Sequence, residues 1–255
     1  MFVLMLTMIL SVAEMNDNEL PANLSDLYGK ALTAMIRRLD QHRKGAGGDA
    51  AEVEQILQRL AFHSHIRDSQ FRNFTTSEAS GWLASGTAMH EGGWAQVSAL
   101  VRRGRLPLLV ALEKNAGDEE EYRFSHLTFQ EFLTAKGIVE LVERQRTDEE
   151  AKAELVRVLG VGDKLERAFE QAKWQLVLRT CADLLVSAGE LQRMSVLLLG
   201  SGEGSFKKGG KELGARALEP YLCANHQLTS LKFEEGDLGD AGLRILVDGD
   251  DGPRR

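Results

Sequence analysis

Hydrophobic residues recur at spacings of three and four along most of this chain, which is the period of amphipathic helices rather than of strands. The first clear set begins after Asn23, whose side chain can accept a hydrogen bond at a helix N-terminus. The apolar face that follows consists of Leu24, Leu27, Tyr28, Ala31, Met35 and Ile36. Glycines interrupt the pattern at Gly45–Gly48, so we expect a helix followed by a linker.

Three more helices are expected over the next fifty residues. The first carries apolar residues at Val53, Ile56, Leu57 and Leu60. Thr75 and Glu78 precede the second with the spacing of a capping box, in which each side chain satisfies a backbone donor at the helix start. The third spans Trp94–Val101 and ends before Gly104.

The period then changes to two, which predicts strands. In the segment Tyr122–Phe124 two aromatic residues flank Arg123, the pattern of a strand with one buried face. A polar loop containing Asn115 and Gly117 separates it from the apolar run Leu108–Leu112. We therefore expect a β-hairpin.

A helix should follow this hairpin almost at once. Thr128 and Glu131 have capping-box spacing, and Leu127 and Phe132 are placed to pack on one another as a hydrophobic staple. These signals predict a helix that begins at about Phe129. Its apolar face comprises Phe129, Phe132, Leu133, Ile138, Leu141 and Val142.

His126 lies in the joint between the hairpin and this helix. By residue type alone it is either a packing or turn histidine, or a contact for an anion. The second interpretation is open because an imidazole N–H and the free backbone donors of a helix start both favour negative charge.

From Gly137 to Gly189 the pattern is helical throughout. The charged run from Arg144 to Lys152 is expected to be a solvated helix face. Trp174 is expected to pack in the core, like Trp82 and Trp94.

An internal repeat marks the C-terminal part. Gly214–Leu218 and Gly242–Leu246 match at Gly, Arg and Leu, and 242 minus 214 is 28 residues. Leu228–Phe233 predicts a strand within this repeat, and Leu191–Val196 is a second strand candidate. The segment Gly204–Glu212 between the two candidates is expected to be a solvated loop.

Composition bounds the class of protein. The chain has 255 residues, 43% of them hydrophobic, and a net charge of −7, which argues against a broad nucleic-acid footprint. Only two cysteines are present, Cys181 and Cys223, so neither a disulfide scaffold nor a cysteine metal site is supported. His63 and His65 do not share a helix face, and no metal site is expected there. The apolar run Met1–Val12 lacks a basic start and is expected to be a buried helix rather than a secretory signal.

The segment Phe124–Ala135, Phe-Ser-His-Leu-Thr-Phe-Gln-Glu-Phe-Leu-Thr-Ala, resembles the end of the winged-helix domain of NACHT-type signal-transduction ATPases, the NOD-like receptor architecture. In that family the histidine contacts the terminal phosphate of bound ADP and helps to hold the receptor closed. The resemblance implies this nucleotide-binding role for His126, and no ligand contact is assigned to Gln130, Glu131 or Phe132.

The resemblance covers most of the chain and implies a mainly α fold with small β content. The implied parts are the end of a NACHT helical subdomain at residues 1–44, a winged-helix domain at 50–135, a second helical domain at 136–189, the irregular start of a ribonuclease-inhibitor-type leucine-rich repeat at 190–247, and a polar tail at 248–255. The repeat departs from that type at Gly236, where an asparagine is expected.

No phosphate-binding loop of the type Gly-x-x-x-x-Gly-Lys-Ser/Thr is found. In the nearest segment Ser205 stands in place of the first glycine, and Glu212 follows Lys211 where a hydroxyl is needed for magnesium. We therefore expect no catalytic residues, no metal and no cofactor on this chain alone, and ADP or ATP only where a P-loop module is also present. Such a module would make the full-length family protein an ATPase.

The resemblance implies a regulatory and sensor fragment of a cytoplasmic NACHT and leucine-rich-repeat signalling protein. Its expected partners are its own NACHT module or homologous protomers, together with a protein or other ligand on the repeats, without membrane insertion. The alternative is a helical and leucine-rich interaction scaffold with no nucleotide role. Two weaker alternatives are an enzyme and a DNA-binding winged helix, the latter suggested by Arg102, Arg103 and Arg105.

Overall fold

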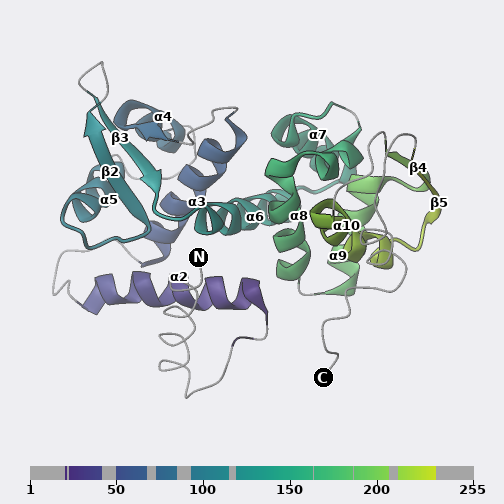
Figure 1. Ribbon diagram of the computed structural model, residues 1–255, viewed down its shortest axis with the longest axis horizontal. Coiled ribbons are helices and arrows are strands. Elements are labelled where there is room, and N and C mark those ends of the chain that lie inside the picture. Colours follow the sequence, from purple (N-terminus) through teal and green to yellow (C-terminus); the bar gives the residue numbers. More distant parts are fainter. Residues whose placement is uncertain are drawn as a thin grey trace. The chain divides into compact units, whose positions relative to one another are not determined.

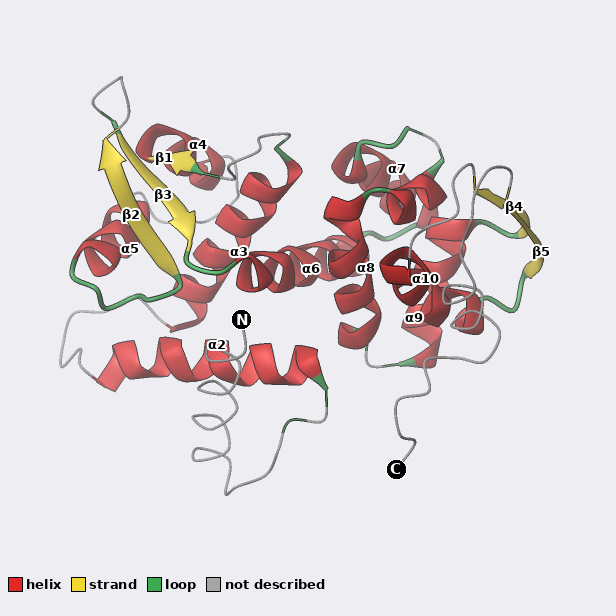
Figure 2. Ribbon diagram, in the orientation of Figure 1, coloured by secondary structure: helices red, strands yellow, loops and turns green. Residues whose placement is uncertain are grey.

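The computed structural model describes residues 21, 23–41, 50–67, 73–84, 93–114, 119–162, 164–185, 187–206 and 212–233 (Figure 1). The chain divides into two compact units, Met1–Thr134 and Ala135–Arg255, which we describe one at a time. Helices dominate the described residues and the strands are few (Figure 2), so the expectation of a mainly α fold with small β content is confirmed.

Several predicted features lie outside the described residues. They are the helix at Met1–Val12, the linker at Gly45–Gly48, the loop with Asn115 and Gly117, the departure at Gly236, the second copy of the repeat at Gly242–Leu246, and the tail at 248–255.

The first unit contains four helices and a small sheet before the long helix α6 among its described residues. Its elements are α2 (Leu24–Gln41), α3 (Ala50–Ile66), β1 (Phe74–Thr75), α4 (Thr76–Ala84), α5 (Gly93–Arg102), β2 (Leu109–Lys114), β3 (Glu120–Phe124) and the first part of α6 (Leu127–Arg144). The sheet is antiparallel with the order β1-β3-β2, so β3 is the central strand. The predicted helices and the hairpin are therefore present, and β1 is an additional strand.

Aromatic side chains hold this sheet against the helices. Phe74 of β1 faces Tyr122 of β3 in register, and both are fully buried. Trp94 of α5 meets the Tyr122 ring edge-on with 4.8 Å between centroids, and lies 5.9 Å from the Phe74 ring. Aromatic pairs of this kind add about 0.5–1.5 kcal/mol each beyond their burial. The core position predicted for Trp94 is confirmed.

Two predicted helix caps are present in this unit. The side chain of Asn23 accepts the backbone N–H of Asp26 at 2.8 Å, at the start of α2. At α4, the backbone N–H of Glu78 donates to the Thr75 hydroxyl at 3.2 Å, and the Thr75 N–H donates to the Glu78 carboxylate at 2.9 Å. This reciprocal pair is the capping box expected from the sequence.

Helix α6 begins earlier than expected, at Leu127 rather than at about Phe129. The predicted staple between Leu127 and Phe132 is wrong, because Leu127 is 46% exposed while Phe132 is buried. The helix continues through Gly137 to Arg144 without a break. Its first part also buries polar residues, and the side chain of Gln130 donates to the Ser64 hydroxyl of α3 at 2.6 Å.

The second unit continues α6 and adds helices and a pair of strands. The added elements are α7 (Asp148–Leu159), a 3-10 helix η1 (Leu165–Glu170), α8 (Ala172–Leu184), α9 (Ala188–Leu199), β4 (Gly202–Phe206), α10 (Glu212–Ala224) and β5 (Leu228–Phe233). Trp174 is fully buried and its indole N–H donates to the Leu159 carbonyl at 3.1 Å, which confirms its core position.

The charged run from Arg144 to Lys152 is solvated, as expected, but it is not one helix face. Helix α6 ends at Arg144 and α7 begins at Asp148. Thr147 and Glu150 form a complete capping box at the start of α7. The sequence carried this Thr-x-x-Glu signal, which predicts the break.

The strand expected at Leu191–Val196 is wrong, because these residues belong to helix α9. Ser187 and Glu190 form a capping box at its start, and the apolar run continues to Leu199, which is longer than a typical strand. The solvated loop expected at Gly204–Glu212 is wrong in its first part, because Gly204–Phe206 belong to β4.

The strand predicted at Leu228–Phe233 is confirmed as β5, which pairs in parallel with β4. Phe206 lies opposite Phe233, so the two strands are offset by 27 residues (233 minus 206). Helix α10 connects them. Elements β4, α10 and β5 therefore form a parallel strand–helix–strand motif, and its offset is close to the 28-residue sequence repeat.

Candidate functional site at the joint between strand β3 and helix α6

The joint is anchored on its strand side by the hairpin. Tyr122 and Phe124 point inward and are buried, whereas Arg123 and Ser125 are exposed. The backbone N–H of Ser125 donates to the Leu108 carbonyl at 2.9 Å, which continues the strand pairing by one residue. His126 comes next and is half-buried.

The imidazole of His126 is held through its Nδ1 atom. The Thr128 hydroxyl oxygen lies 2.6 Å from Nδ1, and the backbone N–H of Thr128 donates to the same nitrogen at an N–N distance of 3.4 Å. Both contacts come from one residue in the first turn of α6. The sequence had assigned Thr128 to a helix cap, so this contact was missed, although the His-x-Thr spacing was visible.

These contacts favour one tautomer of the neutral ring. A backbone N–H can only donate, so Nδ1 must present its lone pair to Thr128. In a neutral imidazole the proton then lies on Nε2. The Thr128 hydroxyl is the second donor to Nδ1, and Nε2–H remains available as a hydrogen-bond donor.

The start of α6 adds donors beside this ring. The first backbone N–H groups of a helix have no partner within the helix and form the positive end of its dipole, a combination that binds anions. Helix α6 is long and its first turns are packed, because Phe129, Phe132 and Leu133 are buried. A helix start of this kind favours a phosphate or carboxylate oxygen, and the His126 ring lies next to it.

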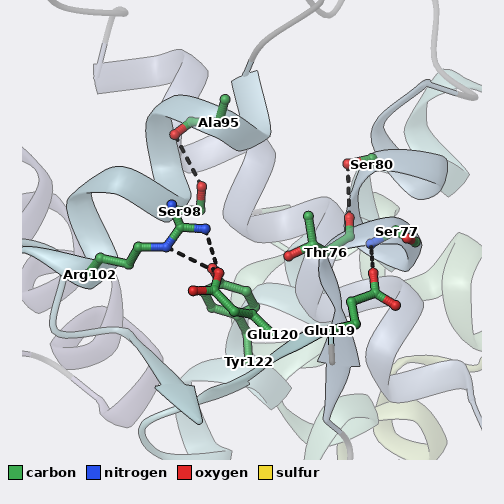
Figure 3. Close-up of polar contacts among 9 residues, drawn as sticks. All are labelled: Thr76, Ser77, Ser80, Ala95, Ser98, Arg102, Glu119, Glu120 and Tyr122. Carbon is green, nitrogen blue, oxygen red and sulfur yellow. Dashed lines mark hydrogen bonds and ion pairs between the residues drawn. The ribbon is translucent and has the colours of Figure 1, made fainter. Parts of the chain in front are cut away.

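A second polar cluster ties the start of β3 to neighbouring elements (Figure 3). The backbone N–H of Ser77 in α4 donates to the Glu119 carboxylate at 2.6 Å, and Arg102 of α5 donates through Nε to Glu120 at 3.1 Å. Glu119 and Glu120 are sequence neighbours and reach in opposite directions (Figure 3). Asn73 donates to Glu121 at 3.1 Å. Each carboxylate therefore holds a different segment.

This cluster perturbs the ionisation of its members. Hydrogen bonds from Arg102 and Tyr122 lower the pKa of Glu120, and the same carboxylate raises the pKa of Arg102. Burial, together with the 2.7 Å bond that its hydroxyl donates to Glu120, raises the pKa of Tyr122. This cluster is not among the sites predicted from the sequence, although four consecutive acids at Asp118–Glu121 are a visible signal.

The ion pair between Arg102 and Glu120 also affects how the basic residues Arg102, Arg103 and Arg105 could bind DNA. All three arginines are exposed, and the Arg102 guanidinium contacts Glu120. A cation shared with a carboxylate is less suited to neutralise a phosphate. The basic cluster thus does not act as three independent cations.

Other candidate ligands are placed by packing. The His63 ring stacks on Trp82 at 5.5 Å between centroids, and His65 is buried. Cys181 is buried, which raises the pKa of its thiol, and Cys223 is exposed. Partial desolvation of the Cys223 thiol, together with the nearby Glu219 carboxylate, raises the pKa of Cys223. Within the part of the chain that the structure describes, no three His, Cys, Asp or Glu side chains are grouped to hold a metal ion.

The described helices also bear on the membrane. None of them combines the length and the apolar character needed to cross a bilayer.

Comparisons with known proteins leave this site to be judged on its geometry. No model of a protein family matches the chain, and a search of curated proteins found no match either.

Proposed function

We propose that this chain is a regulatory and sensor fragment of a NACHT and leucine-rich-repeat signalling protein. In this proposal His126 donates Nε2–H to the terminal phosphate of ADP held by a P-loop module. The proposal is supported by the joint, where the His126 imidazole accepts a hydrogen bond at Nδ1 and precedes the first turn of a long, packed helix. A phosphate group matches both kinds of donor.

The order of elements in the first unit supports the winged-helix part of the proposal. Helix α3, the short strand β1, helices α4 and α5 and then the hairpin β2–β3 follow one another, with β1 at the other edge of β3. This order agrees with a winged helix. The segment that resembles the NACHT family begins at the last strand of this unit.

The parallel strand–helix–strand of the second unit supports the repeat. Its 27-residue offset is near the repeat of leucine-rich units, which stack such elements into an array. In this proposal the array binds a protein or other ligand, and the site of action is the cytoplasm.

The proposed mechanism is a nucleotide switch. ADP contact through His126 holds the winged helix against the P-loop module, and exchange to ATP loosens this contact. The protomers then expose a surface for oligomerisation. The chain itself would not hydrolyse the nucleotide, because the sequence given carries no P-loop motif.

Calorimetry of ADP binding tests the proposal. It is measured on this chain and on a version extended upstream through the genomic reading frame to include a P-loop module. We expect ADP binding by the extended protein alone, weakened by His126→Ala. Equal ADP affinity in the His126→Ala variant would remove His126 from the mechanism. An absence of binding by both proteins would favour the interaction scaffold.

A further inference from the structure

We propose that Thr128 is the positioning residue of His126, and that it fixes both the tautomer and the direction of the ring so that Nε2–H faces the bound anion. The identity of that anion as a nucleotide phosphate rests on the proposed function. The contacts between Thr128 and the ring do not.

Two donors of one residue converge on one atom of the ring. The hydroxyl lies 2.6 Å from Nδ1, and the backbone N–H reaches it at 3.4 Å. A ring protonated on Nδ1 would set its N–H against the N–H of Thr128, and a ring flipped by 180° would place Cδ2–H there instead of an acceptor. Thr128 therefore selects the Nε2–H tautomer and one of the two ring orientations.

Thr128 is itself held in place. It lies in the first turn of α6, between the half-buried His126 and the buried Phe129. The Tyr28 ring packs edge-on against Phe129, with 5.6 Å between centroids, and lies tilted against Phe132 at 6.0 Å. The packing of α2 on α6 thus fixes the start of α6. The Thr128 hydroxyl, held there, fixes the position of the His126 ring through its contact with Nδ1.

The start of α6 also places Thr128 beyond the capping position. A capping hydroxyl belongs to the residue just before the first helical residue. Helix α6 begins at Leu127, so Thr128 lies inside it and its hydroxyl is directed to His126. A donor held in its bound orientation loses less entropy on binding, which is the benefit expected for the nucleotide.

The test compares Thr128→Val, which removes the hydroxyl at nearly constant shape, with Thr128→Ser, which keeps it. Thr33→Val is the matched control, because the Thr33 hydroxyl donates only to a backbone carbonyl of its own helix, that of Gly29, at 2.9 Å. Circular dichroism checks that each variant is folded.

The first readout is nitrogen NMR of labelled histidines in this chain, at about pH 8.5, where a model histidine is neutral. The signals of His126 are identified by their loss in His126→Ala. We expect the Nδ1 resonance of a hydrogen-bonded acceptor in the wild type and in Thr128→Ser, and a shift toward that of a free acceptor in Thr128→Val. An unshifted Nδ1 resonance in Thr128→Val would overturn the proposal.

The second readout is ADP affinity of the extended protein. Loss of one net hydrogen bond predicts about 2- to 10-fold weaker binding in Thr128→Val, with recovery in Thr128→Ser. If His126→Ala weakens binding and Thr128→Val does not, the positioning role is wrong while the proposed function stands. If neither variant changes ADP affinity but the NMR shift is seen, Thr128 still orders the ring and the nucleotide role is wrong.

Discussion

Replacing Asn225 should destabilise the second unit more than any exposed substitution near it. Asn225 is 5% exposed and lies between helix α10 and strand β5. Its side-chain amide donates to the Gly200 carbonyl at 3.0 Å, and its side-chain oxygen accepts the backbone N–H groups of Gln227 and Leu228, each at 3.1 Å. One side chain thereby joins the end of α9 to the start of β5.

The magnitude follows from these three bonds. A net contribution of about 0.5–1.5 kcal/mol per bond gives about 1.5–4.5 kcal/mol for Asn225→Ala. Gln227 is exposed, so water can replace the bond to its N–H. The Leu228 N–H keeps a longer bond to the backbone carbonyl of residue 225, at 3.4 Å, whereas the half-buried Gly200 carbonyl loses the side-chain donor. We therefore expect a loss of about 2–3 kcal/mol in the free energy of unfolding.

The assay reports on the second unit through the buried thiol of Cys181. In a Cys223→Ser background, the labelling of Cys181 by a thiol reagent is followed across a urea titration, because this thiol is buried until its unit opens. The matched control is His226→Ala, at the exposed neighbouring position, where a change within about 0.5 kcal/mol is expected. An Asn225→Ala loss no larger than that of the control would refute the anchoring role.

Three further outcomes are expected. Gly160→Ala should lower the free energy of unfolding by about 1 kcal/mol, because Gly160 ends α7 at φ +64°. Gly81→Ala within α4 should raise it by a similar amount. Thermal melts should therefore show melting temperatures shifted in opposite directions, and shifts in the same direction would contradict this. Hydrogen bonds lower the pKa of Glu120, so its carboxylate stabilises the folded state by at most about 1 kcal/mol. This stabilisation is present above the pKa of an unfolded carboxyl and is lost as the pH falls through the pKa of the folded state. The stability difference from Glu120→Gln should shrink below about pH 4.5, and a difference constant from about pH 3 to 7 would contradict this. Cys223 should react with a maleimide in the native protein while Cys181 reacts only on unfolding, as mass spectrometry of the labelled peptides can determine.

Local signals in the sequence predicted the elements whose stabilising contacts are local. The box of Thr75 and Glu78 and the cap at Asn23 each involve residues three apart, and both are present. The strand predicted at Leu191–Val196 is wrong because three apolar residues in a six-residue segment are too few to distinguish a strand from a helix. The box at Ser187 and Glu190 was the signal that distinguishes them.

Contacts between residues far apart in the chain, and side chains with two competing partners, could not be predicted from the sequence. Strand β1 has only two residues, so it shows no period, and it exists because Phe74 and Thr75 pair with β3. At the candidate site the position of His126 was predicted, but the role of Thr128 was not. Its hydroxyl had two plausible partners, a helix N–H and the Nδ1 of His126, and spacing alone did not distinguish them.

The pairing of β1 with β3 also bears on the order in which the first unit folds. Phe74 pairs with Tyr122 across 48 residues (122 minus 74), while the hairpin pair Leu109 and Phe124 spans 15 (124 minus 109). The longer loop costs about 1 kcal/mol more to close. Strand β1 should therefore dock after the hairpin has formed and detach before it. Because Phe74 is part of the aromatic core, its departure would open that core to solvent while the hairpin stays intact, and the amides of β1 should exchange hydrogen with water earlier than those of β2.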